Sequence, residues 1–181
     1  MNKLVLKLTL KVSIRLGALR RLRTNLTILA SKNIDRSMIL PLFYYCDIAC
    51  HGISATNSEK LESLKQRAGK IVTQSKHINL LEELGWTSLS NRRNYHQCIS
   101  VYRCLHYPEP QILCDKVVLC NHTYNRRRNN MNIILPKMRT EIGKKTFSYS
   151  ASKLFNILPA EIKNSETLLK FKFKLRKLFS L

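Results

Sequence analysis

Glycine and proline are scarce in this chain, with five of each in 181 residues. Both residue types punctuate chains built from many short strands and turns, so their scarcity argues against such an architecture and for long helices. No run of about 18 apolar residues occurs either, which excludes a conventional transmembrane helix. The length suffices for one domain with a sizeable core, or for one and a half small ones.

Acidic residues are also few: 11 Asp and Glu stand against 32 Lys and Arg, which gives a formal charge of +21. Such an imbalance opposes compaction by self-repulsion and attracts polyanions. A single basic residue is usually an ordinary solvated side chain. An excess of this size instead indicates a nucleic-acid partner.

The sequence has few of the residues that phosphoryl-transfer chemistry needs. Metal-dependent catalysis of that kind uses clustered carboxylates to hold its cations, and the three aspartates, Asp35, Asp47 and Asp115, are isolated from one another. There is no Asp-Asp pair, glycine-rich phosphate loop or His-x-x-x-His motif with an intervening glutamate. We therefore expect no catalytic residues, no cofactor and no small-molecule substrate.

Six cysteines are present, but no Cys-x-x-Cys pair. A mixed group of metal-ligating residue types does occur within 19 residues: Cys104, His106, Cys114, Cys120 and His122. Its spacings fit neither a zinc knuckle nor a zinc finger, so free thiols in a reducing compartment are favoured over a structural zinc site.

The amino terminus has no credible secretory signal, because Lys7 and Lys11 interrupt its apolar region. A mitochondrial presequence is the alternative, since the first acidic residue is Asp35. An internal stretch of a basic protein would look the same, and we expect a non-secreted protein of the nucleus or cytoplasm.

The clearest helical pattern lies within residues 79–106. After Gly85 and Trp86, apolar residues recur at three- and four-residue steps: Leu89, Tyr95, Cys98, Ile99, Tyr102 and Leu105. This spacing predicts an amphipathic helix that Ser88 or Ser90 caps and that Pro108 ends. Arg92, Arg93 and Arg103 fall outside the apolar face, so we expect them to be exposed.

Five further helices are predicted around this one. Residues 1–23 fit both an alternating strand pattern and a helical stripe, and their Leu, Lys and Arg content favours the helix. A second helix spans about 38–48 and kinks or begins at Pro41. A third follows a capping box at residues 56–59. The last two begin at Gly143 and after Asn164 or Ser165.

Between residues 115 and 140 the regular pattern is lost. Two short apolar runs, 117–119 and 133–135, flank a polar, basic stretch. We therefore predict a mainly α protein, a multi-helix bundle of about six to seven helices with an extended, partly β or irregular basic arm. Its predicted parts are a helical bundle (1–114), the arm (115–140) and carboxy-terminal helices that pack on the bundle (141–181).

Basic residues interleaved with aromatic ones are the best candidates for a binding site. Arg and Lys neutralise phosphates, and aromatic rings can stack on unpaired bases, although periodicity favours core packing for Tyr95 and Phe147. The loop at 124–130 has no amphipathic pattern that would explain its three arginines. The predicted nucleic-acid-binding residues are Arg92, Arg93, Tyr124, Arg126, Arg127, Arg128, Arg139, Lys144 and Lys145.

Several strings in this order resemble one family. They are ILPLFYYCD (39–47), LKQRA (64–68), LLEELGW (80–86), RRNYH (92–96), LPKMRT (135–140), GKKTFSYS (143–150), LP (158–159) and the closing helix at 171–178. Together they are similar to the carboxy-terminal part of non-LTR retrotransposon reverse transcriptases of the jockey-like group of LINE elements. The similarity runs from about residue 15 onward, with departures such as Tyr44 where the family usually has Asp.

The resemblance places the chain after the polymerase palm, in the thumb and post-polymerase region. The family's catalytic aspartates lie upstream, in a Tyr-x-Asp-Asp turn that this sequence lacks, and its endonuclease domain is absent too. The resemblance therefore implies an all-helical part of an RNA-directed DNA polymerase that grips template-primer or element RNA without performing chemistry, with the upstream polymerase domain as a further partner. The alternative is a structural module whose basic amphipathic ends bind an acidic partner or a membrane surface.

Overall fold

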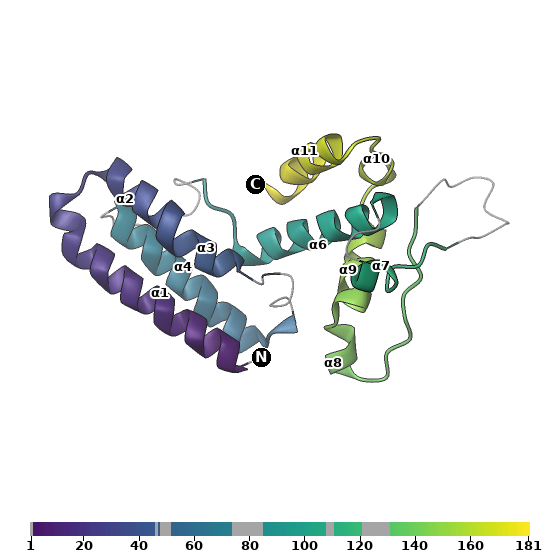
Figure 1. Cartoon of the computed structure of the whole chain (residues 1–181), viewed down its shortest axis with the longest axis horizontal. Coiled ribbons are helices and arrows are strands. Elements are labelled where there is room, and N and C mark those ends of the chain that lie inside the picture. The colour runs from purple at the N-terminus through teal and green to yellow at the C-terminus, as the bar shows by residue number, and fades with distance from the viewer. Residues whose placement is uncertain (1, 46, 48–51, 74–84, 108–110, 121–130) are drawn as a thin grey trace. The chain divides into compact units, whose positions relative to one another are not determined.

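The structure is a computed structural model that describes residues 2–45, 47, 52–73, 85–107, 111–120 and 131–181 (Figure 1). These residues are mainly helical and contain no strand. They form two compact units, Met1–Ser90 and Asn91–Leu181, and each has its own hydrophobic core. The predicted fold class, a mainly α, multi-helix protein, is confirmed.

The boundary between the units differs from the predicted division at residues 114 and 140. It falls near the start of the helix predicted within residues 79–106, which the predicted division places wholly in the amino-terminal bundle (1–114). The reason is that most apolar side chains of this helix share a core with residues beyond 130.

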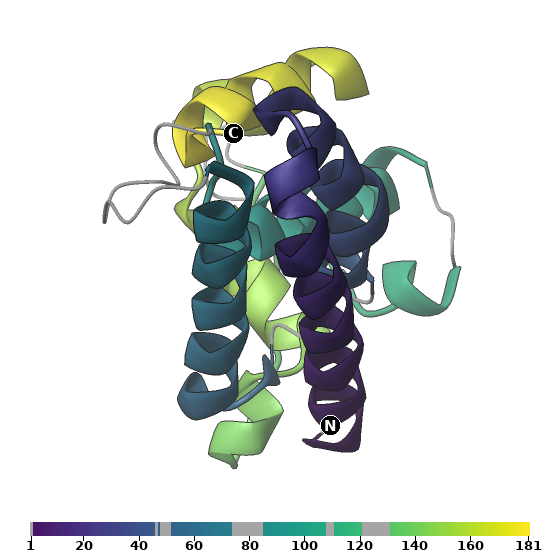
Figure 2. The ribbon, with the colours of Figure 1, turned by 90° about the vertical axis from the view of Figure 1, so that its left-hand side faces the viewer.

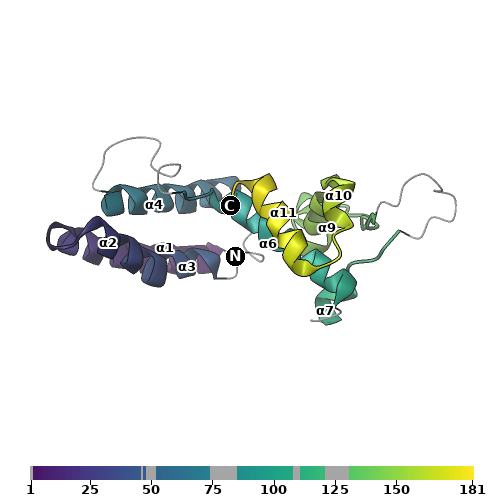
Figure 3. The same ribbon diagram turned by 90° about the horizontal axis from the view of Figure 1, so that it is seen from above.

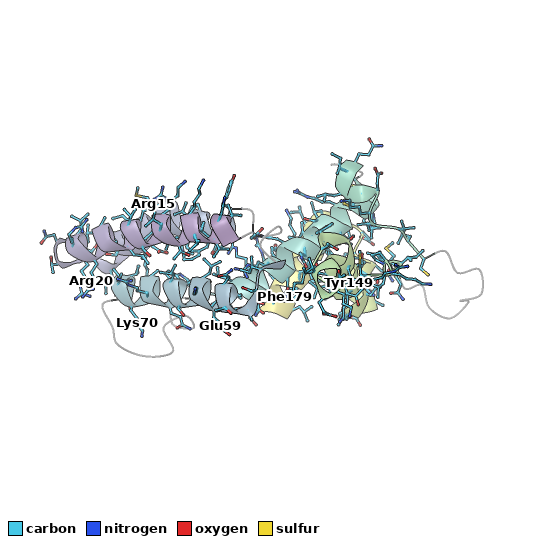
Figure 4. The ribbon with its side chains drawn as sticks, turned by 90° about the horizontal axis from the view of Figure 1, so that it is seen from below. Arg15, Arg20, Glu59, Lys70, Tyr149 and Phe179 are labelled. Carbon is cyan, nitrogen blue, oxygen red and sulfur yellow. The ribbon has the colours of Figure 1, made fainter. Side chains whose placement is uncertain are left out.

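The first unit consists of α1 (Asn2–Leu22), a 3-10 turn (Arg23–Asn25), α2 (Ile28–Ile34), a π-helical turn (Asp35–Ile39), α3 (Leu40–Tyr44) and α4 (Ala55–Thr73). Figures 2 and 3 show α1 and α4 side by side, with α2 and α3 on the same side of α4 as α1. Glu59 and Lys70 on α4 point away from α1 (Figure 4).

Helix α1 resolves the ambiguity of the first 23 residues in favour of the helix. Its buried face consists of Val5, Leu8, Val12, Leu16 and Leu19, which are the predicted helical stripe apart from Leu22. Leu22 also fits the spacing of this stripe, but it is 53% exposed at the end of the helix.

The segment around Pro41 is a continuous run of α, π and α turns rather than a single kinked helix. Pro41 stands in the first turn of α3, where its missing backbone donor is tolerated. The wider π turn lies immediately before it. The Arg15 guanidinium of α1 donates a hydrogen bond to the Met38 carbonyl oxygen, which ties α1 to this turn.

The core of the first unit contains a buried carboxylate. Asp35 is fully buried, and neither of its carboxylate oxygens has a hydrogen-bond partner among the described residues. Burial raises the pKa of this carboxyl from 3.8 to about 6, although the nearby Lys65 ammonium acts in the opposite direction. Lys65 is itself buried and donates a hydrogen bond to the Thr87 carbonyl oxygen.

Two polar contacts join α4 to the start of α6 (Leu89–His106). One is the Lys65 bond to Thr87. In the other, the Leu89 backbone N–H donates to Glu62 Oε2 at 3.0 Å, so a carboxylate from a different helix serves an exposed donor at the start of α6. The predicted capping box at 56–59 is wrong: α4 starts at Ala55, and the Ser54 hydroxyl accepts from Asn57 N at 3.4 Å.

The second unit contains most of α6, then α7 (Gln111–Cys114), α8 (Glu141–Lys144), α9 (Phe147–Ile157), α10 (Ala160–Lys163) and α11 (Leu168–Phe179). Figure 1 shows α9 and α11 on opposite sides of α6. Tyr102 of α6 stacks on Phe171 of α11 with ring centroids 4.2 Å apart. Phe155 of α9 lies 6.3 Å from the Phe171 ring, so one aromatic group links three helices.

The arm predicted around 115–140 is irregular where the structure describes it, at 115–120 and 131–140. Its two sides meet in one antiparallel bridge between Leu119 and Ile133. The Asn156 side chain of α9 fixes this bridge, because its Oδ1 accepts from Ile133 N and its Nδ2 donates to Ile133 O, both at 2.8 Å. The arm is therefore anchored on the second unit.

Candidate nucleic-acid interface

Positive charge is denser in the second unit. The sequence places 18 Lys and Arg against five Asp and Glu in Asn91–Leu181, compared with 14 against six in Met1–Ser90. The exposed cations of this unit are therefore the first candidates for a polyanion-binding site.

The first cation group stands at α8. Thr140 caps this short helix by accepting from Gly143 N at 3.0 Å. The predicted site residues Arg139, Lys144 and Lys145 are all exposed. Lys144 pairs with Glu141 at 2.6 Å, and this hydrogen bond raises the pKa of the Lys144 ammonium and lowers that of the Glu141 carboxyl. Glu141 thus offsets one of the three charges, while all three cations remain accessible from solvent.

The three arginines of α6 differ in their exposure to solvent. Arg103 is exposed, Arg92 is partly buried and Arg93 is only 5% exposed, so the prediction that Arg93 faces solvent is wrong. The reason is that α6 is covered on a second face as well, where Arg93, Gln97 and Val101 follow one another at four-residue steps and are all buried. Gln97 Nε2 donates to Ser150 Oγ of α9 at 3.3 Å on that face.

The loop with Tyr124, Arg126, Arg127 and Arg128 lies outside the described residues. Its expected role in binding nucleic acid stays a prediction from the sequence.

A second cation group, on α11, was missed. The α11 segment carries seven apolar residues among its five basic ones, and none of these five is among the predicted binding residues. In the structure Phe171 and Leu175 are fully buried, whereas Leu169 is 78% and Phe173 is 61% exposed. The signal was present in the spacing: Leu169 and Phe173 lie two residues before Phe171 and Leu175, which places them on the opposite side of a helix.

One side of α11 carries residues at steps of three and four: Leu169, Lys172, Phe173, Arg176 and Lys177. Lys172 is partly buried, and the other four are exposed. We call this stripe the α11 outer face. Lys177 Nζ lies 4.9 Å from the centroid of the Phe173 ring, within the range of a cation–π contact. Thr167 caps the helix by accepting from Lys170 N at 3.3 Å, in place of the predicted Asn164 or Ser165.

The two other lysines of α11 have partners within the unit. Lys170 pairs with Glu166 at 2.5 Å, and Lys174 Nζ donates to the Glu161 carbonyl oxygen at 2.6 Å. For Lys172, Arg176 and Lys177 the described residues provide no ion pair. The cations that share the α11 outer face with Phe173 are therefore those for which the described residues provide no ion pair.

The aromatic residues near the predicted basic residues of α6 and α8 are buried or partly buried. Tyr95 is 7% exposed, which confirms that it packs in the core. Phe147 is partly buried against the core of the second unit, and Tyr149 is partly buried as well.

The described cysteines do not assemble a metal site. Among the described part of the chain, no three His, Cys, Asp or Glu side chains stand close enough to hold a metal ion, and His122 lies outside that part. Cys98 is a fully buried free thiol whose pKa burial raises to about 12. Burial, together with a hydrogen bond to Cys114, raises the pKa of the Cys104 thiol to about 12 as well.

Compared with protein-family models, curated proteins and solved structures, the chain has no match. In the helices that the structure describes, no segment combines the length and the apolar character needed to cross a membrane.

Proposed function

We propose that this chain is a nucleic-acid-binding, carboxy-terminal part of a non-LTR retrotransposon reverse transcriptase, without the catalytic palm and the endonuclease. One observation carries the binding proposal: the second unit exposes cations at α8 and on the α11 outer face with few acidic residues to compensate them. The ordered strings from 39–47 to 171–178 support the family assignment.

RNA is the proposed ligand class, in the form of element RNA or template-primer, with DNA as a second substrate of the same surface. Such a surface neutralises phosphates without reading base sequence, and its affinity falls steeply with salt. A fluorescence titration of labelled RNA with the purified chain tests the proposal directly. We expect binding that salt weakens, and no saturable binding at low salt would contradict it.

A second candidate function is supported by the outer side of α1. Leu6, Leu10 and Ile14 are 63–66% exposed there, and lysines stand in the same helix at positions 3, 7 and 11. Exposed apolar side chains add nothing to phosphate neutralisation, but they do suit an acidic amphipathic partner or an anionic membrane surface. Anionic vesicles and unlabelled RNA, added as competitors to the labelled RNA complex, separate the two functions.

We also propose that the chain has no polymerase activity of its own. The proposal rests on the isolated aspartates in the sequence, of which Asp35 is buried in the first core. Incorporation of labelled nucleotide on a primed RNA template with magnesium or manganese, above a protein-free control, would contradict it.

A further inference from the structure

We propose that the α11 outer face is a platform for single-stranded nucleic acid, on which Phe173 stacks against an unpaired base while Lys172, Arg176 and Lys177 neutralise the flanking phosphates. The inference rests on the proposed function. It narrows the proposed ligand from polyanions in general to nucleic-acid strands with unpaired bases.

Phe173 is exposed although it is a large apolar residue on a helix that packs on a core. A helix that packs on a core turns its large apolar residues inward, as α11 does with Phe171 and Leu175, both fully buried. Phe173 is 61% exposed on the opposite side, beside Leu169 at 78%. Neither side chain contributes to the core of the second unit, so stability does not explain a phenyl ring at this position.

Three basic residues share the α11 outer face with the Phe173 ring. Lys172 precedes Phe173, and Arg176 and Lys177 follow it by one helical turn, so cations stand on both sides of the ring along the helix. Lys177 Nζ lies 4.9 Å from the ring centroid. No described acidic side chain forms an ion pair with any of these three, and Glu166, just before the helix, pairs with Lys170.

The features of the α11 outer face indicate which ligand it binds. An exposed phenyl ring that shares a helix face with Lys172, Arg176 and Lys177 offers a π-face and phosphate partners together, and this pair of features binds single strands without sequence preference. A duplex would use the cations alone, because its bases are already stacked and paired. Single-stranded nucleic acid is the ligand that uses the whole face.

The second unit is built to hold this face in position. Phe171, between Lys170 and Lys172, stacks on Tyr102 at 4.2 Å and so fixes the rotation of α11. The Tyr102 hydroxyl donates to the Ser165 carbonyl oxygen at 2.5 Å just before the helix begins. The outer face is thus presented by a helix whose opposite side is locked in the core.

The test compares two labelled probes of equal length, an oligouridine single strand and a blunt RNA duplex, bound to the full chain. Phe173→Ala is expected to weaken single-strand binding by about 5- to 150-fold and to leave duplex binding unchanged. Tyr45→Ala is the matched control, since Tyr45 is 64% exposed in the other unit and should change neither affinity. Circular dichroism verifies that both variants keep their helix content.

A second variant tests the cations. Replacing Lys172, Arg176 and Lys177 by glutamine should lower the salt-dependence slope for the single strand by about 2, at about 0.7 per phosphate. Equal effects of Phe173→Ala on both probes, or no effect on either, would overturn the platform while leaving nucleic-acid binding intact. Absence of RNA binding by the unaltered chain would instead refute the proposed function. Loss of binding to anionic vesicles in Phe173→Ala, with RNA binding unchanged, would assign the face to a membrane surface.

Discussion

A few polar side chains are buried inside the hydrophobic cores of the two units. Asp35 and Lys65 are charged residue types that are almost fully buried in the first unit. In the second, the Tyr102 hydroxyl is buried and satisfied by a backbone carbonyl group. Each such group makes stability sensitive to a single change, because buried polar groups are costly without partners.

Asp35 should make the stability of the first unit depend on pH. Its folded-state pKa of about 6 lies above the ordinary 3.8, so the folded chain retains a proton that the unfolded chain releases. The corresponding stabilisation is complete below about pH 4 and is lost as the pH rises through about 6. The free energy of unfolding of the wild type, relative to Asp35→Asn, should fall by up to about 3 kcal/mol over that window. Denaturant titrations at several pH values measure it, and a difference independent of pH would contradict it.

Tyr102→Phe should destabilise the second unit. The substitution keeps the ring that stacks on Phe171 but removes the donor to the Ser165 carbonyl oxygen, leaving a buried acceptor without its partner. The expected loss is about 1–3 kcal/mol of unfolding free energy. Tyr107→Phe serves as the control, since Tyr107 is 53% exposed and its change should stay within about 0.5 kcal/mol. Identical melting of the two variants would remove the hydrogen bond from the account.

Among the elements, the helices with one buried stripe were predictable and those with two were not. Val5, Leu8, Val12, Leu16 and Leu19 follow the helical period, so the buried face of α1 could be read from the sequence. On α6 the second buried face contains Arg93 and Gln97, and no hydrophobic pattern marks it.

Helix ends were predicted less well than helix positions. Ser, Thr and Asn residues stand close together around the starts of α4 and α11, and each is an acceptable cap by type. Which one accepts the bond depends on where the chain enters the helix, as Ser54 and Thr167 show. The donor at Leu89 is served by Glu62, 27 residues away, which local sequence rules cannot find.

Two leucines on different sides of α1 test which face of this helix is buried. Leu16 of α1 is fully buried in the core of the first unit, whereas Leu10 on the same helix is 63% exposed. Leu16→Ala should cost about 2–5 kcal/mol of unfolding free energy. Leu10→Ala should change it by no more than about 0.5 kcal/mol. Thermal or denaturant unfolding of this matched pair decides the matter, and equal losses would mean that the buried face of α1 is misassigned.

For the whole molecule, charge is the property that the sequence predicts most directly, whereas its distribution needs the fold. The excess of +21 is evident from composition. That Arg93 is buried and that Arg176 and Lys177 flank an exposed ring could be learned only from the packing of α6 and α11. The candidate surface therefore shifted from the start of α6 toward α11, while Arg139, Lys144 and Lys145 remained in it.

The arginines at 126, 127 and 128 should add to the same binding reaction. Their replacement by alanine is expected to lower the salt-dependence slope for single-stranded RNA by up to about 2, because three phosphates lose their partners. Helix content should not change. Tyr124→Ala should weaken binding with less effect on the slope, since stacking involves no counterion release. An unchanged slope in the triple variant would exclude the loop from the interface.

The central claim is that this chain binds nucleic acid through exposed cations, and the salt dependence of RNA binding tests it most directly. The affinity of the full chain for a labelled single strand is measured at several salt concentrations and plotted as log K against log salt. If the three cations at α8, the three of the α11 outer face and the three arginines at 126–128 each neutralise one phosphate, the slope is about −6. A slope near zero, or affinity for anionic vesicles that RNA does not compete away, would contradict the account.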